Sequence, residues 1–165
     1  MSENRLIPAH GGYRKLRSFQ TAQTVYDLTV LFCNRFIDKR SRTHDQMVQA
    51  ARSGVARASL EELLLDYEDF LRQRGLKIWS KDSPEALSVR AKFKSDRSDV
   101  SDKADPYGVA AATDQTAANT LICLINQASY LLRKQLENLE KTFLTEGGFT
   151  ERLYRQRKTN RDQPA

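Results

Sequence analysis

The chain has 165 residues, 39% of them hydrophobic and 29% charged, a length that supports one domain with a hydrophobic core and is short for two. Lysine and arginine total 27 against 21 acidic residues, a net charge of +6; this favours anionic partners, although a charge of this size also simply keeps a small domain in solution. No apolar run approaches the roughly 20 residues that cross a bilayer, and no signal-peptide pattern is present, so we expect a cytoplasmic protein with no membrane contact.

The first part of the chain predicts an arm followed by two helices. Residues 1–12 end in two glycines before any apolar periodicity begins, which favours a flexible arm. Residues 19–37 carry apolar side chains mostly three and four apart, which predicts an amphipathic helix with Ser18 as its N-cap. After a polar turn, Thr43 and Gln46 have the spacing of a capping box at the start of a second helix.

The second and third predicted helices meet without a loop. The third helix has a seam of apolar residues that alternate four and three apart and ends at Gly75, as in a packed bundle. The seam residues are Ala56, Leu60, Leu63, Tyr67 and Phe70. Because antiparallel neighbours need a connection of a few residues, either the two helices form one helix bent around Gly54, or a connector after Gly54 is absent from this chain.

The second half of the chain predicts a polar insert, one long helix and a basic tail. Residues 80–108 are rich in serine and mixed charges and are expected to be mobile, with a short helix over residues 85–93 capped by Ser83. The long helix begins near Thr113 or Asp114 and ends at the glycines 147–148, and residues 149–165 form the tail. The long helix has more apolar residues than one buried stripe needs, which predicts either a subunit interface or burial under residues 76–79. The apolar residues in question are Leu121, Ile122, Leu124, Ile125, Leu131 and Leu132.

No pattern in the sequence indicates catalysis, a cofactor or a metal ion. His10 and His44 are the two histidines, and neither has a partner at metal-ligand spacing. Cys33 and Cys123 lie in apolar helical stretches, which predicts buried and reduced thiols. The acidic residues of the third helix lack the Glu-x-x-His pairs of bundle metal sites and indicate a solvated face. These acidic residues are Glu61, Glu62, Asp66, Glu68 and Asp69.

Three basic clusters are the candidate nucleic-acid-binding residues. They are Arg14, Lys15 and Arg17 before the first helix; Lys39, Arg40 and Arg42 in the first turn; and Arg152, Arg155, Arg157, Lys158 and Arg161 in the tail. Tyr154 lies within the last cluster, where its ring could stack on a base. Such residues neutralise phosphates, but turns and tails also collect charge without a ligand, and the sequence leaves both interpretations open.

Three runs of the sequence resemble a bacterial protein family. They are FQTAQTVYDLTVLFCNRFI at residues 19–37, HDQMVQAARSG at 44–54 and VARASLEELLLDYEDFLRQRG at 55–75. In their order along the chain and in their residue pattern, they resemble the four-helix-bundle proteins encoded in intervening sequences of 23S ribosomal RNA genes. They also resemble the related accessory variability determinants of diversity-generating retroelements. The likeness covers residues 13–75, and the last helix by pattern only. The family's Asn-Ile-Ala-Glu-Gly type of connector is missing after Gly54.

The resemblance implies an all-α, up-down-up-down four-helix bundle over residues 13–148 that assembles into a homopentameric barrel without enzymatic activity or a cofactor. In the retroelement relatives, a basic surface of the barrel binds a reverse transcriptase and nucleic acid. We therefore predict a non-enzymatic oligomeric adaptor that binds RNA or DNA, as an accessory to an enzyme such as a reverse transcriptase. The alternative is a structural protein-interaction scaffold with no nucleic-acid role.

Overall fold

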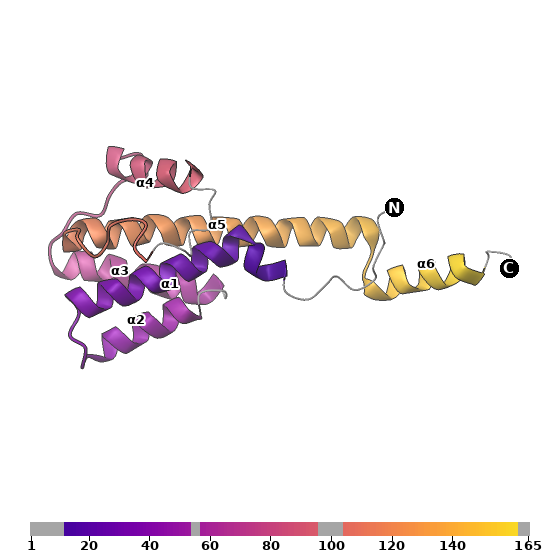
Figure 1. Ribbon diagram of the computed structural model, residues 1–165, viewed down its shortest axis with the longest axis horizontal. Helices are drawn as coiled ribbons and strands as arrows, with labels where there is room; N and C mark the ends of the chain where they lie inside the picture. Colours follow the sequence, from indigo (N-terminus) through magenta and orange to yellow (C-terminus); the bar gives the residue numbers. More distant parts are fainter. Residues whose placement is uncertain (1–11, 54–56, 96–103, 162–165) are drawn as a thin grey trace. The chain divides into compact units, whose positions relative to one another are not determined.

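The computed structural model describes residues 12–53, 57–95 and 104–161 (Figure 1). These residues form a short 3₁₀ turn and six α-helices, which confirms the predicted all-α class. The elements are η1 (Gly12–Lys15), α1 (Arg17–Phe36), α2 (Arg42–Arg52), α3 (Arg57–Gln73), α4 (Pro84–Ser95), α5 (Asp114–Glu146) and α6 (Phe149–Arg161). The predicted arm, except for its last residue, and residues 96–103 of the predicted mobile insert lie outside the described residues.

The chain divides into two compact units at a boundary inside α5. The first unit is residues 13–132 and contains helices α1 to α4 together with the first half of α5. The second unit takes in residues 133–165 and, at the other terminus, residues 1–12. Its described helical parts are the second half of α5 and α6.

In the first unit, α1, α2, α3 and the first half of α5 share one hydrophobic core. Phe32 of α1 lies at its centre, with ring centroids 4.9 Å from Tyr67 and 4.8 Å from Phe70 in edge-to-face contact. Met47 of α2 and Leu121 of α5 are fully buried in the same cluster. The predicted α3 seam faces this core at each position whose side chain the structure describes, namely Leu60, Leu63, Tyr67 and Phe70.

Two helix ends follow the predicted signals. Gly75 has a φ of 65°, and the following Leu76 N–H donates to the Leu71 carbonyl at 2.9 Å, which together close α3 with a left-handed C-terminal turn. Thr113 caps α5, because its Oγ1 accepts from the Thr116 N–H at 3.2 Å. The predicted end of the third helix and the predicted start of the long helix are therefore confirmed.

The N-caps predicted for the first two helices are wrong. Helix α1 begins at Arg17 with Leu16 in the cap position and no side-chain cap bond, so Ser18 lies inside the helix and is buried. In α2 the cap is Ser41, whose Oγ accepts from the His44 N–H at 3.2 Å. A capping residue needs an extended backbone, and Ser41 has one, with φ −80° and ψ 145°, whereas Thr43 is already helical.

Helices α2 and α3 are separate elements that contact each other. The Ser53 N–H donates to the Gln49 carbonyl at 3.0 Å where α2 ends, and α3 starts at Arg57. The alternative of one helix bent around Gly54 is therefore wrong, because the two helices face each other. Loss of a connector at this point stays a prediction.

Asn119 holds the segment after α3 against α5. Its side chain is 1% exposed, and its Oδ1 accepts from the Trp79 N–H at 2.8 Å. Its Nδ2 donates to the Lys77 carbonyl at 2.8 Å and to the Gln115 carbonyl of its own helix at 2.9 Å. Every polar atom of this buried amide is therefore used, and the extended segment is fixed at two backbone groups.

Helix α4 packs on the core of the first unit, in the place where a short helix is predicted. Ser83 Oγ accepts from the Ala86 N–H at 3.2 Å, which confirms the predicted cap. Ala86 is 2% exposed, and Val89 and Phe93 lie against the core. Part of the predicted mobile insert, residues 84–95, is thus an ordered helix with an apolar side.

The apolar surplus at the start of α5 is buried inside the chain. Its exposed fractions are 0% for Leu121, 8% for Ile122, 1% for Leu124 and 0% for Ile125, and Leu131 and Leu132 are half-buried. The first four residues therefore offer little surface to another subunit, and the predicted subunit interface stays a prediction. They are buried in the core shared by the helices of the first unit, against which Leu76 of the predicted covering segment also packs.

Candidate nucleic-acid interface

The first two predicted clusters lie at opposite ends of α1. Arg14 and Lys15 are exposed in η1 before the helix, and Lys39 and Arg40 are exposed in the turn after it. Helix α1 has 20 residues, and a helix of that length spans about 30 Å. The structure therefore does not bring these two clusters together on one surface.

Arg17 packs between two helices. Its guanidinium carbon lies 4.5 Å from the centroid of the Phe93 ring, and its Nη2 donates to the Phe93 carbonyl. These contacts join α1 to the end of α4, and the side chain is half-buried. The structure thus gives Arg17 a packing role that its place in a basic cluster did not indicate.

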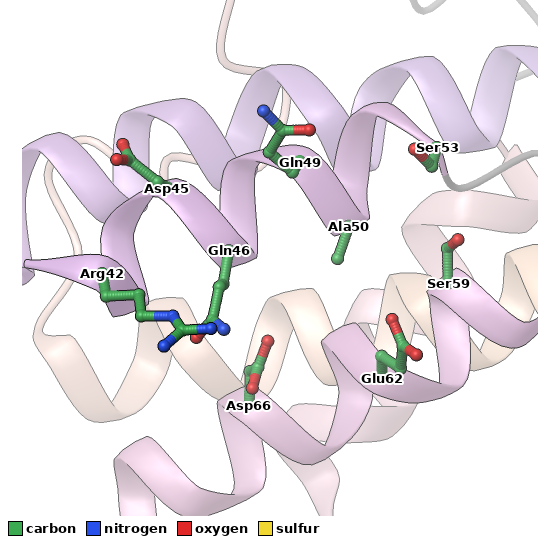
Figure 2. A pocket seen from close by; sticks show the side chains of 9 residues that line it. All are labelled: Arg42, Asp45, Gln46, Gln49, Ala50, Ser53, Ser59, Glu62 and Asp66. Atoms are coloured by element: carbon green, nitrogen blue, oxygen red, sulfur yellow. The ribbon is translucent and has the colours of Figure 1, made fainter.

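Arg42 lies in an acidic cleft between α2 and α3. The cleft has a volume of about 560 Å³ and is also lined by Asp45, Glu62 and Asp66. In Figure 2 the Arg42 side chain extends from α2 toward Asp66 on α3. Burial raises the pKa of Asp66, and the neighbouring charges of Asp69 and Glu62 raise it further. The negative potential of these carboxylates opposes phosphate binding at Arg42.

The basic tail forms helix α6 directly after the end of α5. Gly147 has a φ of 76° and its N–H donates to the Phe143 carbonyl at 2.9 Å, which ends α5. The next N–H, that of Gly148, donates to Glu151 Oε2 at 2.9 Å. A glutamate in this position satisfies the cap N–H, as in half of a capping box. The prediction that these glycines end the long helix is confirmed. The same turn also leads directly into α6.

One face of α6 combines an aromatic ring with three cations. Arg157, Lys158 and Arg161 follow Tyr154 by three, four and seven residues, so all four side chains lie on the same side of the helix. All four are exposed, and Tyr154 is 70% exposed. We call these residues the basic face of α6. The helix contains five basic residues and one acidic residue, Glu151, a net charge of +4.

The other tail residues of the prediction lie elsewhere on α6. Arg155 is exposed, and its guanidinium reaches back to the turn, where a Cβ on Gly147 would lie 3.0 Å from Nη2. Arg152 belongs to α6, but its side chain lies outside the described residues. The basic face therefore contains three of the predicted tail residues.

Two arginines outside the predicted clusters bind backbone carbonyls. Arg35 Nη1 donates to the carbonyls of Val109, at 3.2 Å, and of Ala112. Arg74 Nη2 donates to the Phe36 carbonyl at 3.0 Å. Their partners are 38 or more residues away in the chain, so no local pattern could have indicated them. Part of the positive charge thus serves the fold, and the net charge overstates the surface open to an anion.

The potential metal ligands and thiols have structural surroundings. In the described ranges, no group of three or more His, Cys, Asp or Glu side chains is arranged to hold a metal ion. His44 lies with Nε2 3.4 Å from Asn34 Oδ1, and His10 is outside those ranges. Both thiols are free: Cys33 is buried, as predicted, and Cys123 is half-buried. Burial, followed by the charge of Asp66, raises the pKa of the Cys33 thiol to about 12.

No family model, no curated protein and no solved structure matches this chain. The resemblance to the intervening-sequence family therefore stays a prediction. In the part of the chain that the structure describes, no helix combines the length and the apolar character needed to cross a membrane.

Proposed function

We propose that this protein is a non-enzymatic, oligomeric adaptor that binds RNA or DNA through the basic face of α6. The observation that carries the proposal is the exposed Tyr154 ring with Arg157, Lys158 and Arg161 on the same side of one helix. Cations at this spacing neutralise successive phosphates and release their counterions. The ring supplies a surface on which a base stacks without regard to its identity.

The sequence resemblance supplies the assembly part of the proposal. We propose that α1, α2, α3 and α5 form an up-down-up-down bundle and that five copies assemble into a barrel. The shared core of these four helices supports the first statement. In a ring, five copies of a weak basic face act together, which raises the effective affinity for a long polyanion. An enzyme that acts on nucleic acid, such as a reverse transcriptase, is the proposed protein partner.

Binding to labelled RNA and DNA across a salt series tests the basic face. The Arg157→Ala/Arg161→Ala variant should weaken binding and lower the slope of log affinity against log salt by between about one and two units. The matched control is Lys39→Ala/Arg40→Ala, which removes the same charge from the turn after α1. Equal losses in both variants would show that only net charge matters, and no binding by the native protein at low salt would refute the proposal.

A protein-interaction scaffold without a nucleic-acid role is the second candidate. It is favoured by large apolar side chains exposed on the second half of α5, among them Leu144, which is 74% exposed. Absence of nucleic-acid binding, together with capture of an acidic protein partner by α6, would support this second function.

A further inference from the structure

The second half of α5 carries an exposed apolar stripe. Leu136 and Leu139 are each 58% exposed, and Phe143 is 63% exposed, although its ring lies beside Gly148. These residues follow one another by three and four positions, so they lie in one line along the helix. A line of large apolar side chains of this kind on a solvated helix marks an interaction surface.

The stripe has the heptad pattern of a coiled-coil seam. With Leu136 and Phe143 at positions a, Leu139 takes position d, and the preceding d position is Leu132. The e positions, which flank the seam, are Arg133 and Glu140. The g positions are the uncharged Gln135 and Thr142.

We infer that this stripe binds the same stripe of a second copy of the chain, with the two α5 helices antiparallel. In this arrangement Leu136 packs against the partner's Leu139, and Phe143 packs against the partner's Leu132. The contact is two-fold symmetric, so each layer occurs twice. All three exposed apolar residues of the stripe become covered.

Charge complementarity selects this occupant and this register. Antiparallel coiled coils pair e with e positions, so Arg133 meets the partner's Glu140 twice, at two symmetry-related places on the same side of the seam. A shift by one heptad in either direction places Arg133 against the partner's Arg133, or Glu140 against the partner's Glu140. A parallel pair would match g with e, which joins Gln135 to Glu140 and gives no ion pair. Within its own helix Arg133 also contacts Glu137, at 3.5 Å, and an exposed pair of this kind is weak enough to share its arginine.

The size of the contact sets its strength. The seam from residue 132 to residue 143 is about 18 Å long, which is short for a coiled coil and typical of a transient interface. We therefore expect association that depends on protein concentration over the micromolar to millimolar range. Because a two-fold contact joins assemblies in pairs, it doubles the mass of whatever assembly the rest of the chain forms.

Sedimentation velocity over a concentration series, with full-length protein and no nucleic acid, tests the pairing. Arg133→Glu and Glu140→Arg each place like charges across the seam, so each variant alone should associate about tenfold more weakly or worse. A mixture of the two restores both pairs and should associate like the native protein. Lys141→Glu makes the same charge change as Arg133→Glu at the f position, away from the seam, and should leave association unchanged.

Leu139→Glu separates the contact from folding. Because the native side chain is more than half exposed, this variant should keep the native melting temperature and lose the association. A native protein whose mass does not change with concentration would overturn the inference, as would a mixture of the charge variants that behaves like either one alone. Nucleic-acid binding plays no part in these measurements, so the proposed function is tested separately.

Discussion

In the buried core, the Tyr67 hydroxyl donates a 2.9 Å hydrogen bond to Thr29 Oγ1 and thereby joins α3 to α1. Both side chains are 0% exposed. Burial raises the pKa of the Tyr67 phenol well above its usual value, because the ionised form would have no water around it. This bond is directional, so it favours one register between two helices that also share apolar contacts such as that between Phe32 and Tyr67.

Tyr67→Phe should lower the free energy of unfolding by about 1–2 kcal/mol, because it leaves the Thr29 hydroxyl buried without its partner. Urea unfolding measures the change. Replacing both residues, as Tyr67→Phe with Thr29→Val, should cost less than the sum of the single changes. Tyr154→Phe, on an exposed residue, is the control and should have no effect. Additive losses in the double variant would contradict a direct bond.

The Cys33 thiol predicts a loss of stability at alkaline pH. Its pKa rises from the ordinary value of 9.0 to about 12 in the folded protein, so the folded state holds the proton more tightly than the unfolded state. The resulting stability is fully present below pH 9 and is lost as the pH rises toward 12, at no more than about 1.4 kcal/mol per pH unit. Chemical denaturation at several pH values checks this. Cys33→Ala should show a shallower decline, and identical slopes would refute the assignment.

Asn119→Ala should loosen the segment between α3 and α4. The change removes the partners of the Trp79 N–H and the Lys77 carbonyl, and should cost about 2–3 kcal/mol. Because Trp79 is the one tryptophan of the chain, its fluorescence reports this segment directly. We expect a red-shifted emission and faster hydrogen exchange at the Trp79 amide. Native emission and exchange in the variant would show that the apolar contacts alone hold the segment.

Arg17→Ala should affect stability and leave nucleic-acid binding unchanged. The variant loses the stacking on Phe93 and the hydrogen bond to its carbonyl, at a cost of about 1–2 kcal/mol in unfolding free energy. Arg17→Lys keeps the charge but not the planar stack, so it should be intermediate. Lys15→Ala is the control, because it removes a positive charge from an exposed residue without removing the packing on Phe93. The packing role would be contradicted if Arg17→Ala had the native stability and bound RNA more weakly than Lys15→Ala does.

Tyr154 tests the stacking part of the proposed function. Tyr154→Ala should weaken binding to single-stranded RNA by about 1–3 kcal/mol, because stacking on the ring is lost. Tyr154→Phe should bind like the native protein, since stacking needs the ring and not the hydroxyl. Fluorescence anisotropy with one labelled oligonucleotide measures all three proteins. Equal weakening by both variants would indicate that the hydroxyl makes the contact.

Local patterns predicted most of the helices because helix signals are themselves local. The α3 seam, the end at Gly75 and the caps at Ser83 and Thr113 all depend on residues within one or two turns of each other. The N-cap of α2 was predicted wrongly although its signal is equally local, because Ser41 and Thr43 are both good capping residues. The choice between them depends on which one keeps an extended backbone in the folded turn.

The candidate site was harder to predict, because the sequence shows where the charged residues are but not which groups their side chains contact in the folded protein. Arg17, Arg42 and Arg157 look alike in the sequence, yet one packs on a ring, one lies among carboxylates and one belongs to an exposed face. Contacts with other helices decide the first two outcomes: Phe93 of α4 for Arg17, and Glu62 and Asp66 of α3 for Arg42. The tail cluster was identifiable, whereas its helical spacing around Tyr154 became visible only once α6 was known to be a helix.

Helix α5 has one continuous backbone but two different sources of stability. Its first half is anchored by side chains such as Ile125, which is fully buried, whereas large apolar side chains of its second half, such as Leu139, are more than half exposed. A short helical segment with little packing lies close to its helix–coil midpoint. Pairing of the stripe, as inferred above, would add to the stability of these last turns without being needed for the fold of the first unit, so we expect their hydrogen-exchange protection to rise with the protein concentration.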